Sequence, residues 1–235
     1  ILLKNYILDA ENTMYEVGLY GAFYKLSIIM TLFIQTFRYA AEPFFFHQKS
    51  KKNNKAIYAD VMKYFIVAMS VIFLMVTIFY DFFELFLGSE YHDQRGYKVV
   101  SILLLANFFL GIYYNLAIWY KLTDKTIYGA GLSFFGAIIT ITLNITLIPY
   151  FGFIGSAWAT LGCYFSMALC SYFLGKRFFP IDYNLKRIGF YFISMLLIYL
   201  CTYFINMWFN GLLLLLFVIL VFVLEKNDLK RYSYK

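Results

Sequence analysis

The chain has 235 residues, of which 63% are hydrophobic and only 14% are charged, and its formal net charge is +7 at pH 7. A soluble globular protein of this length needs more polar surface than such a composition can supply. A soluble globule is therefore excluded, and we expect the lipid bilayer to form part of the solvent of this protein.

Long apolar stretches recur along the whole chain. A helix crosses the roughly 30 Å of bilayer hydrocarbon with about 20 apolar residues. Strands of a membrane barrel alternate in polarity, whereas the run Ile102 to Leu105 is apolar on all sides. The sequence therefore predicts an all-α, polytopic transmembrane bundle that forms a single membrane domain over residues 1–235. In chain order the seven predicted spans are 17–46, 61–80, 98–120, 126–149, 152–175, 187–206 and 210–224.

The charges between these spans predict an orientation. Lys and Arg near span ends stay on the cytoplasmic side, whereas Asp and Glu have little effect. Alternate connections hold 15 of the 20 cations, and the other connections hold three cations and seven of the 13 acidic residues. We therefore expect a cytoplasmic carboxyl terminus, with residues 1–16 outside. The cations of the predicted cytoplasmic set are Lys49, Lys51, Lys52, Lys55, Lys63, Lys121, Lys125, Lys176, Arg177, Lys186, Arg187, Lys226, Lys230, Arg231 and Lys235.

Several other features narrow the class of protein. The positive charge faces anionic lipid, so we do not expect nucleic-acid binding. Cys163, Cys170 and Cys201 fall inside spans and have no metal-ligand spacing, so no metal site is predicted. The chain opens at Ile1 with neither an initiator Met nor a signal-peptide pattern, and we expect it to be a fragment of a longer protein.

The first span carries the polar side chains that are most informative about function. An ionised side chain near the bilayer centre costs about 2.5 kcal/mol or more unless it is paired or hydrated. Lys25 lies about 100° around this helix from Glu42. The polar residues that share one face, within about 60°, are Tyr24, Thr31, Gln35, Arg38 and Glu42.

Two interpretations of this polar face remain open. In the first, Arg38 and Glu42 form an ion pair that only fixes helix packing. In the second, the face lines a cavity, and the excess of two cations over one carboxylate favours an anionic ligand. The predicted substrate-binding residues are then Arg38, Lys25, Glu42 and Gln35, with Tyr24 and Thr31 as further cavity side chains.

Other polar or small residues within spans give weaker signals. Asn107, Asn115 and Asn144 are candidates to line the same cavity, although hydrogen bonding between helices, worth about 1 kcal/mol, is the commoner role. Gly155 predicts a close contact between helices. Trp119 and similar rings near span ends are expected to lie at the membrane interface.

Two stretches resemble a known family. Gly18 to Lys25, followed by Phe37-Arg-Tyr-Ala-Ala-Glu-Pro43, is similar to the eighth helix of bacterial polysaccharide-repeat flippases, and Asn144 to Thr160 is similar to the turn between their eleventh and twelfth helices. These are the O-antigen and exopolysaccharide flippases of the multidrug/oligosaccharidyl-lipid/polysaccharide exporter superfamily, which are related to lipid II flippases. The resemblance implies two six-helix lobes around a central cavity, often with two further helices. This chain would then correspond to helices eight to fourteen.

The resemblance also implies a function. Such a protein is not an enzyme but moves undecaprenyl-diphosphate-linked oligosaccharide from the cytoplasmic to the outer leaflet of the bacterial inner membrane. Its partner is an anionic lipid-linked diphosphate, without a cofactor, and coupling to protons or sodium and contact with polysaccharide polymerase machinery are further implications. Arg38 and then Lys25 would bind the diphosphate, while Glu42 would tune Arg38 or couple to an ion.

Two alternatives stay open beside this resemblance. A membrane-embedded glycosyltransferase, ligase or acyltransferase on the same lipid carriers would need a general base, and the available cluster is Glu84, Glu90, His92 and Asp93. We interpret that cluster as a solvated loop. An ion-coupled extruder of cationic drugs would need net acidic charge in the cavity, opposite to that of the first span.

Overall fold

The computed structural model describes residues 10–51, 53–204 and 207–233, and the predictions for residues 1–9 lie outside this part. The described chain is all-α, as predicted, and contains no strand. Its elements are α1 (Ala10–Gln48), α2 (Asn54–Ile78), α3 (Tyr80–Glu84), η2 (Ser89–Tyr91), α4 (Gly96–Leu116), α5 (Ile118–Leu122), α6 (Ile127–Phe151), α7 (Phe153–Phe178), α8 (Leu185–Cys201) and α9 (Met207–Ser233).

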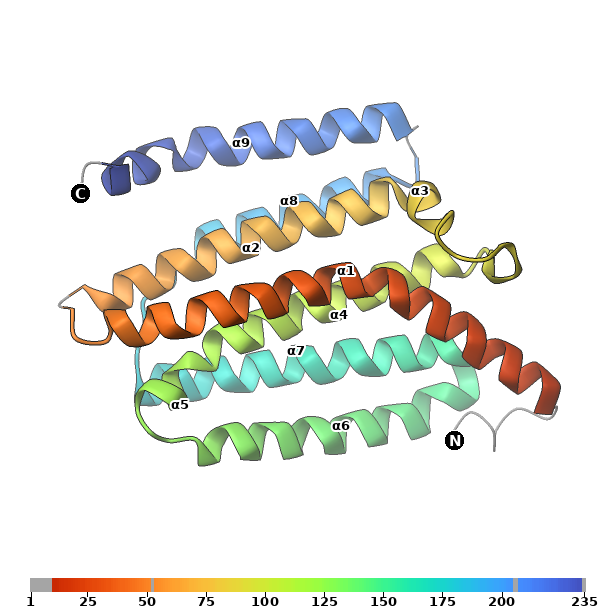
Figure 1. Cartoon of the computed structure of the whole chain (residues 1–235), viewed down its shortest axis with the longest axis horizontal. Coiled ribbons are helices and arrows are strands. Elements are labelled where there is room, and N and C mark those ends of the chain that lie inside the picture. The colour runs from red at the N-terminus through yellow and green to blue at the C-terminus, as the bar shows by residue number, and fades with distance from the viewer. Residues whose placement is uncertain (1–9, 52, 205–206, 234–235) are drawn as a thin grey trace.

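Within the described residues, six helical segments are long and apolar enough to cross a membrane. They are Met14–Gln48, Asn54–Ile78, Gly96–Leu122, Ile127–Phe151, Phe153–Phe178 and Phe209–Lys226. The predicted span 187–206 corresponds to α8, which ends at Cys201, is 17 residues long and covers about 25 Å. It packs alongside α2 and runs in the opposite direction to α7 (Figure 1).

The helices run up and down, so alternate connections lie at the same end of the bundle (Figure 1). One end holds the connections after α1, α5 and α7 and the carboxyl end of α9, and we call it the lysine-rich end. The opposite end holds η2, the α6–α7 turn and the start of α9. The two sets of connections that differ in charge are therefore also separated in space. Which end faces the cytoplasm stays a prediction.

The centre of the bundle is α4. It packs against α1, α2 and α7, and most of its side chains are buried. In contrast, α6 packs mainly on α7, and α9 packs on α2 and α8, so these two helices form opposite edges (Figure 1). Large apolar side chains such as Phe134 and Phe222 are exposed on the edge helices, as expected of a surface that faces lipid.

A tight turn joins α6 to α7. Gly152 adopts φ +56°, a backbone conformation that favours glycine, directly after the helix that contains Pro149. A Cβ atom at Gly155 would lie 2.5 Å from the carbonyl oxygen of Leu147, so only glycine permits this approach. The close contact predicted at Gly155 is therefore confirmed.

Ala117 is a one-residue interruption between α4 and α5, and its backbone keeps helical φ and ψ. The side chains of Trp119 and Tyr120 on α5 are buried inside the bundle rather than facing a membrane interface. Trp119 stacks on Phe178 of α7, with ring centroids 5.6 Å apart. The prediction that Trp119 lies at the interface is therefore wrong, and α5 instead brings its polar residues toward α1.

Candidate functional site

Arg38 lies on α1, about 15 Å before the end of that helix, and its side chain is half-buried. Its guanidinium carbon lies 4.9 Å from the ring centroid of Tyr114 on α4 and 5.6 Å from that of Tyr39. Such contacts stabilise a cation while leaving its hydrogen-bond donors available to a ligand.

Glu42 does not use Arg38 as its ion-pair partner. Its Oε2 atom accepts a hydrogen bond from the Nζ atom of Lys121, on α5, at 2.7 Å. Lys121 of α5 therefore contacts α1, and Arg38 contacts aromatic rings instead. The interpretation of Arg38 and Glu42 as a packing ion pair is thus corrected, since Glu42 joins α1 to α5.

Two pockets meet at Arg38. The small pocket has a volume of about 20 Å³, and its polar lining residues are Arg38, Glu42, Tyr114, Asn115 and Lys121. The large pocket has a volume of about 360 Å³, and Arg38, Tyr114 and Lys121 line it as well. A volume of that size is within the usual range for small-molecule sites. We refer to both together as the Arg38 site.

Tyrosines dominate the wall of the large pocket. Tyr113, Tyr120 and Tyr164 join Tyr114 there, and they come from α4, α5 and α7. Phenol rings offer apolar faces together with hydroxyl groups that donate or accept hydrogen bonds. The large pocket therefore combines aromatic surface with two cations.

The charges at the Arg38 site do not balance. Arg38 and Lys121 contribute two positive charges, and Glu42 contributes one negative charge. The remaining positive charge favours an anionic ligand, and a guanidinium binds phosphate or carboxylate oxygens in a bidentate way. The excess predicted from the sequence is thus present, although Lys121 supplies the second cation instead of Lys25.

The remaining predicted residues of the first span lie elsewhere. Lys25 is exposed and lies 13 residues, or about 20 Å along the axis, from Arg38. Tyr24 is exposed beside Tyr20, with ring centroids 6.2 Å apart, and Gln35 and Thr31 are half-buried. None of these four side chains lines the small or the large pocket.

The three span asparagines have different surroundings. Asn107 donates its Nδ2 hydrogen to the carbonyl oxygen of Ser27 at 3.2 Å and so joins α4 to α1. Asn144 donates to the carbonyl oxygen of Thr140 on its own helix at 2.7 Å. Only Asn115 of the three lines the Arg38 site.

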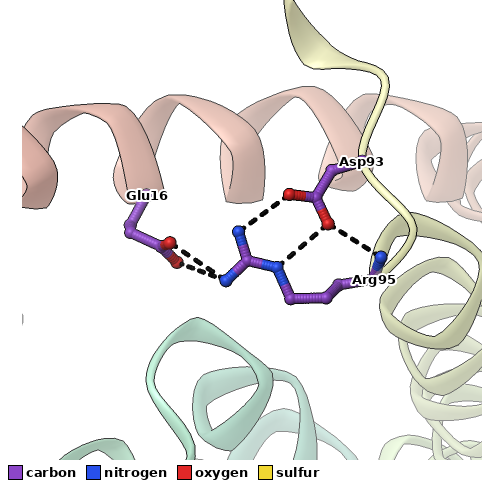
Figure 2. Close-up of polar contacts among 3 residues, drawn as sticks. All are labelled: Glu16, Asp93 and Arg95. Atoms are coloured by element: carbon purple, nitrogen blue, oxygen red, sulfur yellow. Dashed lines mark hydrogen bonds and ion pairs between the residues drawn. The ribbon is translucent and has the colours of Figure 1, made fainter.

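The loop considered above as an alternative enzyme site contains Asp93 and Arg95, which form an ion cluster with Glu16 of α1. We call these three residues the Arg95 clamp (Figure 2). Arg95 donates to Asp93 through Nε at 2.9 Å and Nη2 at 2.8 Å, and to Glu16 on α1 through Nη1 at 3.0 Å. Its guanidinium also lies 4.6 Å from the ring centroid of Phe153. The interpretation as a solvated loop fits the exposed Glu90 and His92 but is corrected for Asp93.

Two carboxylates of the predicted enzyme cluster, Glu84 and Asp93, line one pocket with His92, and both are hydrogen-bonded to neighbouring side chains. Within the described residues, no group of three or more His, Cys, Asp or Glu side chains is placed to hold a metal ion. Asp93 is held by Arg95, and Glu84 accepts a hydrogen bond from the Tyr80 hydroxyl at 3.0 Å. Hydrogen bonds from Arg95 hold the pKa of Asp93 below its usual range, which is unfavourable for a general base near neutral pH.

A second ionic cluster was missed by sequence reasoning. The Lys63 side chain is 4% exposed and lies 2.5 Å from Oε2 of Glu225, which is 1% exposed. Glu225 also accepts hydrogen bonds from Arg187 at 3.1 Å and from the Tyr191 hydroxyl at 2.6 Å. The available signal was Glu225 itself, a carboxylate that follows a run of 14 apolar residues on α9.

Comparison with protein-family models, with curated proteins and with solved structures finds no significant match to this chain.

Proposed function

We propose that this chain belongs to a flippase that moves oligosaccharide linked to undecaprenyl diphosphate from the cytoplasmic to the outer leaflet of the bacterial inner membrane. The observation that supports the proposal is the Arg38 site, where Arg38 and Lys121 face one pocket with a net positive charge inside an apolar helical bundle. The motifs around Arg38 and Pro149 that resemble polysaccharide flippases supply the identity of the substrate.

The chemistry of the substrate matches the charge of the site. A diphosphate cannot cross hydrocarbon unless its charge is compensated. Arg38 offers bidentate donors to phosphate oxygens, and Lys121 of α5 adds a second positive charge to the same pocket. Glu42 would release Lys121 to the phosphate when substrate arrives, because the two anions compete for one ammonium group.

Transport would proceed by alternating access around this site. One group of helices would rock against another and open the pocket first to one side of the membrane and then to the other. An ion-coupled extruder of cationic drugs is less well supported, because the excess positive charge at Arg38 and Lys121 would repel its substrate.

The test measures lipid-linked oligosaccharide separately in the two leaflets of the native host. Cells that lack this protein should accumulate completed oligosaccharide on the cytoplasmic side, and the wild-type gene should restore export. Arg38→Ala should insert normally but abolish export. Lys186→Ala is the matched control, since Lys186 is an exposed cation at the lysine-rich end outside both pockets.

Other outcomes would point to other functions. Incomplete oligosaccharide in the deletion strain, or completed oligosaccharide that reaches the outer face unprocessed, would contradict a flippase and favour an enzyme. Normal export by Arg38→Ala would remove the Arg38 site from the proposal.

A further inference from the structure

Asn115 is a buried side chain whose amide donor lacks a partner. Its exposed fraction is 3%, and its Nδ2 atom has no hydrogen-bond partner among the described residues. Burying an amide donor without an acceptor costs free energy, so native proteins rarely leave one unsatisfied. Such a donor needs an explanation at this position.

The neighbouring asparagines show that packing alone gives a different arrangement. Asn107 lies two turns earlier on α4, and its Nδ2 atom donates to the Ser27 carbonyl across the α1 interface. The Nδ2 atom of Asn144 donates within its own helix. Asn115 is therefore the one of the three that lines this pocket and whose donor has no acceptor among the described residues.

The lining of the small pocket determines which acceptor suits this donor. Asn115 shares that pocket with Arg38 and Lys121, which carry positive charge, and with Glu42, whose Oε2 atom is held by Lys121. The pocket volume of about 20 Å³ admits a group the size of one water molecule or one oxygen atom. A negatively charged oxygen gains most there, because the lining carries two cations against one carboxylate and adds a neutral amide.

We infer that Asn115 is a ligand-binding residue whose Nδ2 atom donates to an oxygen of a phosphate group held by Arg38 and Lys121. This inference rests on the proposed function and adds a neutral donor to its anion site. The phosphate oxygen enters the small pocket, while the rest of the ligand occupies the large pocket that Arg38 and Lys121 also line. Arg38 is already placed for this by its contact with Tyr114, the residue before Asn115.

The test measures binding by the purified full chain in detergent, with farnesyl diphosphate and inorganic pyrophosphate as probes. Asn115→Leu removes the donor at similar volume and should weaken farnesyl diphosphate binding by about 10- to 100-fold. Its melting temperature without probe should be unchanged or higher, because the unsatisfied donor is gone. Asn115→Asp keeps the shape but adds a carboxylate near Glu42, and should weaken binding further.

A matched control separates binding from packing. Asn107→Leu removes a donor that already has a protein acceptor, so it should lower the melting temperature and leave probe affinity within a few-fold of wild type. Arg38→Gln should abolish binding of both probes.

The outcomes distinguish this inference from the proposed function. Wild-type affinity in Asn115→Leu or Asn115→Asp, with loss of binding in Arg38→Gln, would overturn the role of Asn115 and leave the anion site intact. Failure of the wild-type chain to bind either probe would overturn both. Equal affinity for pyrophosphate and farnesyl diphosphate, with the predicted loss in Asn115→Leu, would support the phosphate donor but count against a lipid-linked substrate.

Discussion

Arg95 joins three parts of the chain at the end of the bundle opposite to the lysine-rich end (Figure 2). It binds Asp93 in the loop before α4, Glu16 on α1, and the ring of Phe153 at the start of α7. These contacts raise the pKa of Arg95 and lower that of Asp93, because each charge stabilises the other. Charge-assisted, two-point hydrogen bonding of this kind fixes the geometry of its partners more firmly than a single contact.

The Arg95 clamp should make stability depend on pH in acid. The folded-state pKa of Asp93 lies below its unfolded value of about 4, so its contribution is complete above that pH and is lost as the pH falls through the folded pKa. We expect Asp93→Asn to lower the melting temperature in detergent near neutral pH and to flatten its decline below about pH 4. The residual slope comes from the other carboxylates of the chain.

Glu90→Gln is the matched control for this prediction, since Glu90 is an exposed carboxylate of the same loop. It should leave the pH profile of the melting temperature unchanged. An Asp93→Asn profile that runs parallel to that of the wild type would show that the clamp does not stabilise the fold.

The sequence could predict that Arg38 and Glu42 share one face of α1, but not which residues of other helices join them at the Arg38 site. An Arg and a Glu inside an apolar span are conspicuous, and helical spacing places Arg38 and Glu42 on one face. Spacing describes only neighbours on the same helix, however. Lys121 was interpreted as a loop cation, because helical spacing does not show that α5 packs against Glu42 of α1.

Among the elements, α9 depends on a few polar contacts for its position. It packs on α2 and α8, and many of its large apolar side chains are exposed. Glu225 lies against Lys63 of α2 and against Arg187 and Tyr191 of α8, and so connects all three helices near the lysine-rich end. Removing Lys63 would leave the buried Glu225, among the described residues, with only the half-exposed Arg187 as a counter-charge.

We therefore expect Lys63→Met to be destabilising, by less than the roughly 3–5 kcal/mol of a fully uncompensated buried charge, because Glu225 stays buried with the half-exposed Arg187 as its remaining cation. The double variant Lys63→Met with Glu225→Leu should recover most of this loss, since it removes both buried charges and the half-exposed Arg187 can turn to water. Denaturant unfolding in mixed micelles gives the free energies, and hydrogen exchange in α9 reports whether that helix detaches.

Lys226→Ala serves as the control, because Lys226 is the exposed cation next to Glu225. A Lys63→Met variant as stable as Lys226→Ala would contradict the role of the cluster in holding α9.

Element boundaries were predictable where the sequence carries a stop signal. The predicted spans 126–149 and 152–175 agree closely with α6 and α7, because Pro149 and Gly152 mark the turn between them. The predicted span 187–206 passed the true end of α8 at Cys201, since apolar residues continue through the turn that follows. Hydropathy measures preference for lipid and does not detect where a helix stops.

At the scale of the whole molecule, charge and apolar surface are arranged along different directions. Apolar side chains of α6 and α9 are exposed at the two edges of the bundle, and the connections rich in lysine gather at one end (Figure 1). A bilayer fits this arrangement, with the edges in hydrocarbon and the ends in the headgroup regions. The asymmetry between the two ends then determines which one stays in the cytoplasm.

The lysine-rich end is expected to face the cytoplasm, and single cysteines can test this in intact cells. The background variant has its three native cysteines changed to Ser: Cys163, Cys170 and Cys201. In this background, a membrane-impermeant maleimide should label Glu90→Cys from outside the cell. It should label Lys51→Cys and Lys125→Cys only after the inner membrane is opened. The opposite pattern would contradict the orientation. It would also move the Arg38 site, which lies nearer the lysine-rich end, from the inner to the outer half of the membrane. An inward position is what a carrier that collects its anionic ligand from the cytoplasmic leaflet requires.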